Sequence, residues 1–219
     1  MSKEIAEGYQ IAAVEQWARE NVPSLTPPFT WTRLEGGHSN LTYRIDDNNN
    51  QPAVIRRPPQ GQLLPKAHDM SREWAIISAL QDTPVPVPAA YGFCENPDVT
   101  GAWFYIMGLV DGRPLYNSEE TLAWVPEQRR TRLAHSFIDV LAELHSVDPD
   151  KVGLGNLGKR DSYVGRQLKT WYRSWTSSIQ AAQLDDPRAH DLQNFFLDNL
   201  PDQGPIMIVH GDYGFHNCL

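Results

Sequence analysis

The final stretch of the chain, VHGDYGFHNCL (209–219), places an acid and an amide at a short spacing. The carboxylate of Asp212 is able to accept the proton of an alcohol, and the amide oxygen of Asn217 is a hard ligand suited to Mg²⁺. Phosphoryl transfer to a hydroxyl needs both groups at one end of a rigid strand and loop. An aspartate and an asparagine that only stabilise a surface turn are the alternative interpretation.

A second candidate group combines Glu73 with Arg56. Glu73 falls in the apolar stripe of the helix predicted within 67–83, where a carboxylate needs a partner. In PAVIRR (52–57), the strand period of two places Val54 and Arg56 on one face of a sheet. An Arg56–Glu73 ion pair would put a cation over that face, where nucleotide phosphates could lie. A solvated arginine beside a partly exposed glutamate is the alternative.

A third candidate is the segment GGHSN between two predicted strands. Gly36 and Gly37 let backbone N–H groups approach phosphates closely, and Ser39 and Asn40 add further donors. The two glycines are also compatible with an ordinary hairpin turn.

Hydrophobic periodicity predicts the elements that must position these residues. Ile11, Val14, Trp17 and Ala18 recur at helical spacing and predict a first helix that stops in the Pro23 region. A second helical pattern follows, with Asp69 as its expected N-cap. Segments rich in β-favouring residues predict an antiparallel sheet and lie at 29–45, 52–57, 83–96 and 102–115. Three apolar stripes of helical period follow, at 133–144, 164–175 and 192–196, and the segment 205–210 predicts a strand.

Sheet elements first and helices second predict an α+β protein of two lobes. The boundary falls near 111–115. The predicted domains are therefore an N-terminal nucleotide-binding lobe with its leading helix (1–110) and a helical C-terminal lobe (111–219) that ends at the Asp212 motif.

Composition limits the classes of function. The 219-residue chain carries a formal net charge of −8 at pH 7, which argues against a general nucleic-acid binder, because such proteins usually present a basic surface. No apolar stretch approaches the roughly 18 residues of a membrane span, and the N-terminal segment has no targeting signal. Cys94 and Cys218 indicate reduced thiols. We therefore expect a cytoplasmic protein that binds neither nucleic acid nor membranes.

In their order along the chain, these motifs resemble the aminoglycoside phosphotransferase family of kinase-like enzymes. LEGGHSNLTYRI resembles the family's phosphate loop, VIRR its third strand, REW its helix glutamate, FYIMGLVDGRPL its hinge and HGDYGFHN its catalytic loop. The segments RRPPQGQLLPKAHDMSREW and TPVPVP are similar to the phosphotransferase domain fused ahead of certain acyl-CoA dehydrogenases. The resemblance implies a two-lobed, protein-kinase-like fold with a truncated helical C-terminal lobe.

The resemblance also implies roles for individual residues. It makes Asp212 the catalytic base and Asn217 a ligand of Mg²⁺. Arg56 stands where many relatives carry lysine, and it would hold the α- and β-phosphates of ATP while Glu73 orients it. Because a guanidinium is a planar fork rather than a point charge, its phosphate contacts can differ from those of a lysine.

The hinge residues complete the nucleotide site that the resemblance implies. Met107 would lie at the back of the adenine pocket, with the Gly108 carbonyl and the Val110 N–H at the adenine edge. Val54 would pack on the purine. Many relatives have an acid in place of Gly108, but backbone contacts tolerate that exchange. The implied cofactors are ATP and Mg²⁺.

The expected activity is ATP-dependent phosphorylation of a hydroxyl on a small molecule. Arg166, Lys169 and Arg173 lie at i, i+3 and i+7, and the basic face they form suits an anionic acceptor such as a hydroxyacyl-coenzyme A thioester. A solvated helix face is the alternative. Two other functions stay open: a catalytically incomplete kinase-like nucleotide-binding or interaction module, and an aminoglycoside-type antibiotic kinase, against which the basic region argues.

The family pattern continues past the asparagine into a strand with a second aspartate, which holds Mg²⁺ between the β- and γ-phosphates. This sequence stops at Leu219. We therefore expect a truncation inside a kinase-like domain, with weak ATP binding and negligible transfer by these residues alone. Uncovered apolar surface on the helical lobe would then attract a partner chain, and a homodimer is one arrangement left open.

Overall fold

The computed structural model describes residues 6–34, 40–61 and 69–219. Its sheet has five antiparallel strands in the order β1-β2-β3-β5-β4. The strands are β1 (Thr30–Arg33), β2 (Leu41–Asp46), β3 (Pro52–Arg57), β4 (Ala90–Cys94) and β5 (Phe104–Gly108). The helices are α1 (Ile11–Asn21), α2 (Met70–Ala79), α3 (Ser118–Trp124), α4 (Glu127–Ser146), α5 (Tyr163–Ala182) and α6 (Pro187–Asp198), and a 3₁₀ turn spans Phe215–Asn217.

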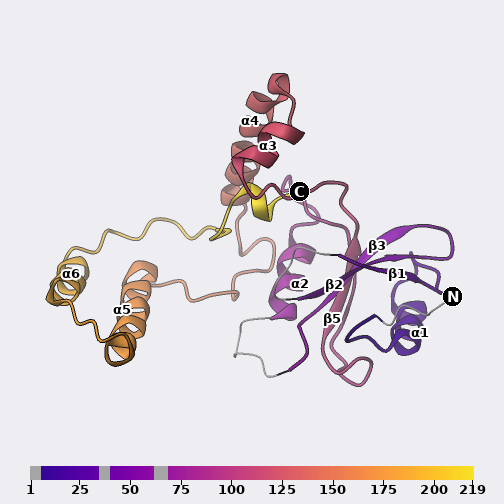
Figure 1. Ribbon diagram of the computed structural model, residues 1–219, viewed down its shortest axis with the longest axis horizontal. Helices are drawn as coiled ribbons and strands as arrows, with labels where there is room; N and C mark the ends of the chain where they lie inside the picture. Colours follow the sequence, from indigo (N-terminus) through magenta and orange to yellow (C-terminus); the bar gives the residue numbers. More distant parts are fainter. Residues whose placement is uncertain (1–5, 35–39, 62–68) are drawn as a thin grey trace. The chain divides into compact units, whose positions relative to one another are not determined.

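One face of the sheet carries the main hydrophobic core. Helix α1 packs Val14 and Ala18 against this face, where Ile45, Ile55 and Ile106 are fully buried. Helix α2 lies on the opposite face (Figure 1). Because the α1 side supplies the apolar packing, the α2 side is free to carry polar groups. The predicted antiparallel sheet and leading helix are confirmed.

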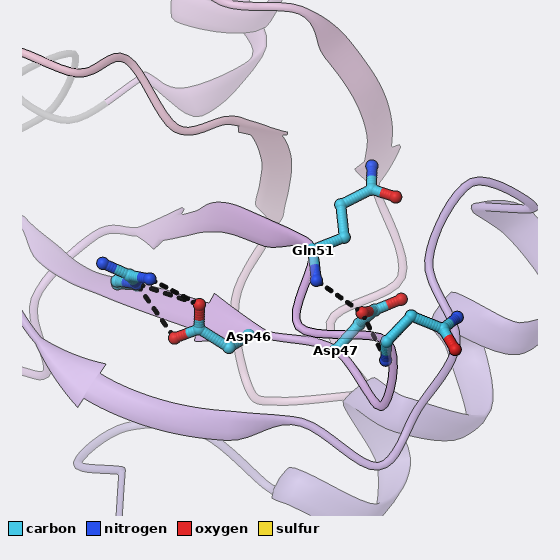
Figure 2. Close-up of polar contacts among 5 residues, drawn as sticks. Asp46, Asp47 and Gln51 are labelled. Atoms are coloured by element: carbon cyan, nitrogen blue, oxygen red, sulfur yellow. Dashed lines mark hydrogen bonds and ion pairs between the residues drawn. The ribbon is translucent and has the colours of Figure 1, made fainter.

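The turn between β2 and β3 is built around the buried side chain of Asp47. Its Oδ1 accepts hydrogen bonds from the backbone N–H groups of Asn49 and Gln51, each at 2.8 Å, and its Oδ2 accepts one from Thr26 at 2.9 Å (Figure 2 shows the first two). Asn50 takes the left-handed conformation that closes the turn. The turn fixes the register of β3, and with it the face that Arg56 occupies.

Helix α2 begins as the sequence predicted. The Asp69 side chain accepts a hydrogen bond from the backbone N–H of Arg72 at 3.2 Å and caps the first turn. Capping satisfies a donor that the helix itself leaves unpaired. The cap sets where the helix starts, and therefore where Glu73 lies in its first turn.

The helical part holds one element that the sequence interpretation missed and one that it predicted wrongly. Helix α3 begins after Asn117, whose side chain accepts a hydrogen bond from Glu120 N–H at 2.8 Å. The segment 205–210, predicted as a strand, is not one. A strand needs a partner for its backbone groups, and among the described residues no strand pairs with this segment.

The chain divides into two compact units. The larger unit consists of 1–154 and 208–219, and the smaller unit of 155–207. The smaller unit is a hairpin of α5 and α6, in which Trp175 lies edge-on to His190. The predicted domain boundary at residue 110 stays a prediction. Within the described ranges, no helix is both long and apolar enough to cross a lipid bilayer.

Candidate active site

The face of the sheet opposite the α1 core, called the open face below because Arg56 and Met107 are only half-buried on it, carries the strand residues predicted to meet a nucleotide. In the register of β3 and β5, Val54 lies opposite Met107, and Arg56 lies opposite Tyr105. Strand side chains alternate between faces, so these four residues share one face. Val54 is buried, whereas Met107 and Arg56 are half-buried. Two apolar side chains and a cation therefore lie side by side on this face.

The predicted contact between Arg56 and Glu73 is present. Arg56 Nε lies 3.1 Å from Glu73 Oε2, and both side chains are about one-third exposed. The Nε–H is not aligned for a hydrogen bond, so the contact is an ion pair. The pair holds the guanidinium on the open face of the sheet. Planar N–H groups in this position suit phosphate oxygens.

Glu73 accepts hydrogen bonds from two side chains, one on β5 and one on the residue that precedes β2. The Tyr105 hydroxyl donates to Glu73 Oε2 at 2.8 Å, and the Asn40 amide donates to Oε1 at 3.2 Å. Burial, and next the charge of Glu73, raise the pKa of Tyr105 far above its ordinary value, so its hydroxyl stays a donor. Sequence reasoning missed Tyr105, although alternation in FYIMG places it on the same face as Met107.

Only one of the remaining residues predicted in the phosphate loop lies within the described ranges. Gly36, Gly37 and Ser39 lie outside the described residues. Asn40 is buried, and its amide contacts Glu73.

The hinge is described in full. Gly108 donates its N–H to the Ala89 carbonyl at 2.8 Å. A Cβ at Gly108 would lie 3.3 Å from the Ala89 Cβ. A side chain there would require the segment that precedes β4 to shift by a few tenths of an ångström. Val110, two residues on, is half-buried.

The C-terminal segment 209–219, called the terminal loop below, brings Asp212 and Asn217 together. The Asn217 amide donates to Asp212 Oδ2 at 2.8 Å and to the Asp212 carbonyl at 3.0 Å. The Asp212 side chain is 77% exposed, and His216 Nε2 lies 3.7 Å from its Oδ1. Because Asn217 uses its amide nitrogen here, its amide oxygen remains an acceptor. The loop therefore presents a carboxylate and an amide oxygen as neighbours.

Aromatic residues anchor this loop to α4. Phe137 stacks on Tyr213 with ring centroids 4.1 Å apart, and Phe215 lies 4.3 Å from the Phe137 ring. The Tyr213 hydroxyl donates to the Phe137 carbonyl at 2.6 Å, and Leu115 N–H donates to the Phe215 carbonyl at 2.9 Å. These contacts hold Tyr213 and Phe215, which follow Asp212 in the sequence, and so restrain the backbone of the loop. Sequence reasoning identified Phe137 only as part of an apolar stripe.

The donor set of the loop fits Mg²⁺. Among the residues that the structure describes, no three His, Cys, Asp or Glu side chains form a group suited to a metal ion. Mg²⁺, however, typically binds through one or two protein groups and completes its coordination with waters and substrate phosphates. In this loop the amide oxygen of Asn217 is such a donor, and it lies beside the Asp212 carboxylate.

The smaller unit carries the predicted basic face on α5. Arg166 pairs with Asp161 at 3.7 Å, and Lys169 and Arg173 are exposed. On the same hairpin the Tyr172 hydroxyl lies 2.6 Å from His190 Nδ1, and His190 Nε2 lies 3.0 Å from Asp185. These contacts join α5 to α6 and give Tyr172 a structural role.

Comparisons with known proteins agree with this arrangement. A family model described as "Phosphotransferase enzyme family" matches residues 30–219. The chain is 31% identical over 216 residues to acyl-CoA dehydrogenase family member 11 of Rattus norvegicus, covering 96% of this chain and 27% of the relative. It is 33% identical over 195 residues to acyl-CoA dehydrogenase family member 10 of Mus musculus, covering 89% of this chain and 18% of that relative.

Among solved structures, the chain is similar to a Ralstonia eutropha protein provisionally named an aminoglycoside phosphotransferase. The TM-score is 0.77 at 30% identity, and the match covers 95% of this chain and 60% of that one. The predicted kinase-like fold, with an antiparallel sheet followed by helices, is confirmed. The chain spans about a quarter or less of the length of the two curated relatives described above.

Proposed function

The chain belongs to the phosphotransferase enzyme family, and on that premise we propose that it catalyses ATP-dependent phosphoryl transfer to a hydroxyl of a small molecule. The observation that carries this proposal is the Arg56–Glu73 ion pair on the open face of the sheet. A guanidinium held in place by a carboxylate is prepared to bind phosphates before the nucleotide arrives.

In this proposal each residue of the nucleotide site on the sheet, called the sheet site below, has one role. Arg56 donates to the α- and β-phosphates, and Glu73 keeps its guanidinium on the open face. Val54 and Met107 pack on the adenine, since they lie opposite each other at the hinge end of β3 and β5. The Gly108 carbonyl and the Val110 N–H meet the adenine edge.

The terminal loop supplies the chemistry. Asp212 accepts the proton of the acceptor hydroxyl as that oxygen bonds to the γ-phosphorus, and the leaving group is ADP. Asn217 is the residue that would hold Mg²⁺ through its amide oxygen, and the ion when bound would neutralise negative charge on the phosphates. The contact between Asn217 and Asp212 keeps the carboxylate in one orientation.

For the acceptor we propose an anionic molecule such as a hydroxyacyl-coenzyme A thioester. Support comes from the exposed Lys169 and Arg173 on α5 and from the names of the curated relatives.

Cys94 and Cys218 are both free thiols, which supports a reducing compartment such as the cytoplasm.

The test uses the full-length gene product with ATP, Mg²⁺ and a panel of hydroxyacyl-coenzyme A thioesters of different chain length. We expect ADP and a phosphorylated thioester to form together. Arg56→Ala should weaken ATP binding by at least about 10-fold, because phosphate contacts are charge-assisted. Arg72→Ala removes an exposed arginine from α2 and serves as the matched control. ATP affinity that is equal in wild type and Arg56→Ala would contradict the proposed site.

A further inference from the structure

We propose that Tyr105 is a positioning residue of the nucleotide site, which holds the Glu73 carboxylate and through it the Arg56 guanidinium. This inference rests on the proposed function only for its effect on ATP. Its structural part, that Tyr105 sets the position of Arg56, stands on the contacts alone.

Within the described part of the chain, the side chain of Tyr105 makes one hydrogen bond, through its hydroxyl. Tyr105 belongs to the interior strand β5 and is only 2% exposed, so the position of its hydroxyl is set by the packing of the sheet. That hydroxyl donates to Glu73 Oε2, the same oxygen that lies 3.1 Å from Arg56 Nε. One carboxylate oxygen therefore connects a rigid buried donor to the cation.

The hydrogen bond matters because Glu73 is otherwise held loosely. Glu73 lies in the first turn of α2 and is one-third exposed. Besides Tyr105, the only uncharged donor to it among the described residues is the Asn40 amide, at the longer distance of 3.2 Å. An ion pair that solvent still reaches gives little geometric restraint by itself. Anchoring Oε2 to β5 removes rotational freedom from the carboxylate. Arg56 is then restrained at the position where phosphates would bind.

Packing of the ring is the alternative task for Tyr105. Its ring centroid lies 6.2 Å from that of Trp74 on α2, and this contact does not depend on the hydroxyl. Phenylalanine at position 105 preserves the ring and removes only the donor. The substitution Tyr105→Phe therefore separates positioning from packing.

The matched control is Tyr9→Phe. Tyr9 is also a buried phenol with one hydroxyl hydrogen bond, to the Leu41 carbonyl at 2.9 Å, and it belongs to the core on the opposite face of the sheet. Both variants should lower the thermal midpoint of unfolding by a similar amount, about 2–4 °C. Only Tyr105→Phe should change the properties of Arg56.

The first measurement needs no nucleotide. Phenylglyoxal labelling of the full-length protein, read by peptide mass spectrometry, reports how readily Arg56 reacts, with Arg72 as the internal reference. We expect Arg56 to react at least about 3-fold faster in Tyr105→Phe and at the wild-type rate in Tyr9→Phe. Equal rates in all three proteins would overturn the proposal, whatever ATP does.

The second measurement compares ATP with adenosine by calorimetry. Tyr105→Phe should weaken ATP affinity by about 3- to 10-fold and leave adenosine affinity unchanged, because only the phosphates contact Arg56. A loss of affinity for both ligands would mean a general packing role and would also overturn the proposal. Wild-type protein that binds neither ligand would refute the proposed function, and the labelling rates would then decide the role of Tyr105.

Discussion

Two aspartates in the larger unit occupy opposite environments. The buried carboxylate of Asp47 accepts three backbone hydrogen bonds, which come from the β2–β3 turn and from Thr26 (Figure 2 shows those of the turn). The Asp212 side chain is 77% exposed and accepts from one side-chain amide. Hydrogen-bond donors that saturate a carboxylate stabilise the fold, whereas unsatisfied lone pairs leave a carboxylate able to accept a proton.

Glu73 lies between these two extremes. It is half-buried, and its three neighbours are side chains rather than backbone groups, one of them the cation Arg56. We therefore expect Glu73 to contribute both to stability and to the nucleotide binding proposed above. The comparison therefore predicts three different responses when Asp212, Glu73 and Asp47 are each replaced.

The largest effect is expected at the exposed carboxylate. Asp212→Asn should lower turnover of the full-length enzyme by about 10²- to 10⁴-fold, because the amide cannot accept the proton of the acceptor hydroxyl. The thermal midpoint and the affinity for ATP should stay close to wild type. Steady-state kinetics and calorimetry check both statements, with the exposed Asp82→Asn as control. Wild-type turnover would exclude Asp212 as the base.

Glu73→Ala should affect stability and binding together. Arg56 and Tyr105 both lose their shared partner, so the free energy of unfolding should fall by about 1–3 kcal/mol and ATP affinity by about 10-fold. Denaturant unfolding and calorimetry measure the two quantities, and the exposed Glu95→Ala is the control. A change in only one of them would break the comparison, since Glu73 would then belong with Asp47 or with Asp212.

The smallest effect on function is expected at the buried turn. In Asp47→Asn one carboxylate oxygen becomes an NH₂ group, so at least one backbone N–H loses its acceptor. The thermal midpoint should fall by about 2–4 °C with no change in ATP affinity. Asp46→Asn, which breaks only the surface pair with Arg44, should cost less.

The effect of Asp47→Asn on stability should depend on pH. Hydrogen bonds from the backbone N–H groups, that of Thr26 first, lower the pKa of Asp47 in the folded protein. A lowered pKa contributes stability above the unfolded value of about 3.9, and that contribution is lost as the pH falls through the folded value. The stability difference between wild type and Asp47→Asn should therefore be complete at pH 7 and shrink below about pH 4. A constant difference down to pH 2 would contradict this origin.

Local patterns in the sequence were sufficient for much of the sheet site. The alternation in PAVIRR predicted that Val54 and Arg56 share a face. The position of Glu73 in an apolar helical stripe predicted that its carboxylate needs a partner, and Arg56 is that partner. Asp69 was predicted as the cap that starts α2. These features depend on strand and helix periods and on capping within a few residues. Such short-range sterics and hydrogen bonds are encoded in the chain itself.

Contacts between distant segments were decided only by the tertiary structure. Tyr105 could be placed on a face from the sequence, but its bond to Glu73 depends on how α2 packs against β5. The bond from Tyr213 to Phe137 joins residues 76 positions apart. The segment 205–210 has the composition of a strand, yet no described strand pairs with it. Sequence periodicity determines which side chains share a face, whereas the packing of whole elements determines which faces meet, because that choice depends on burying apolar surface across the entire chain.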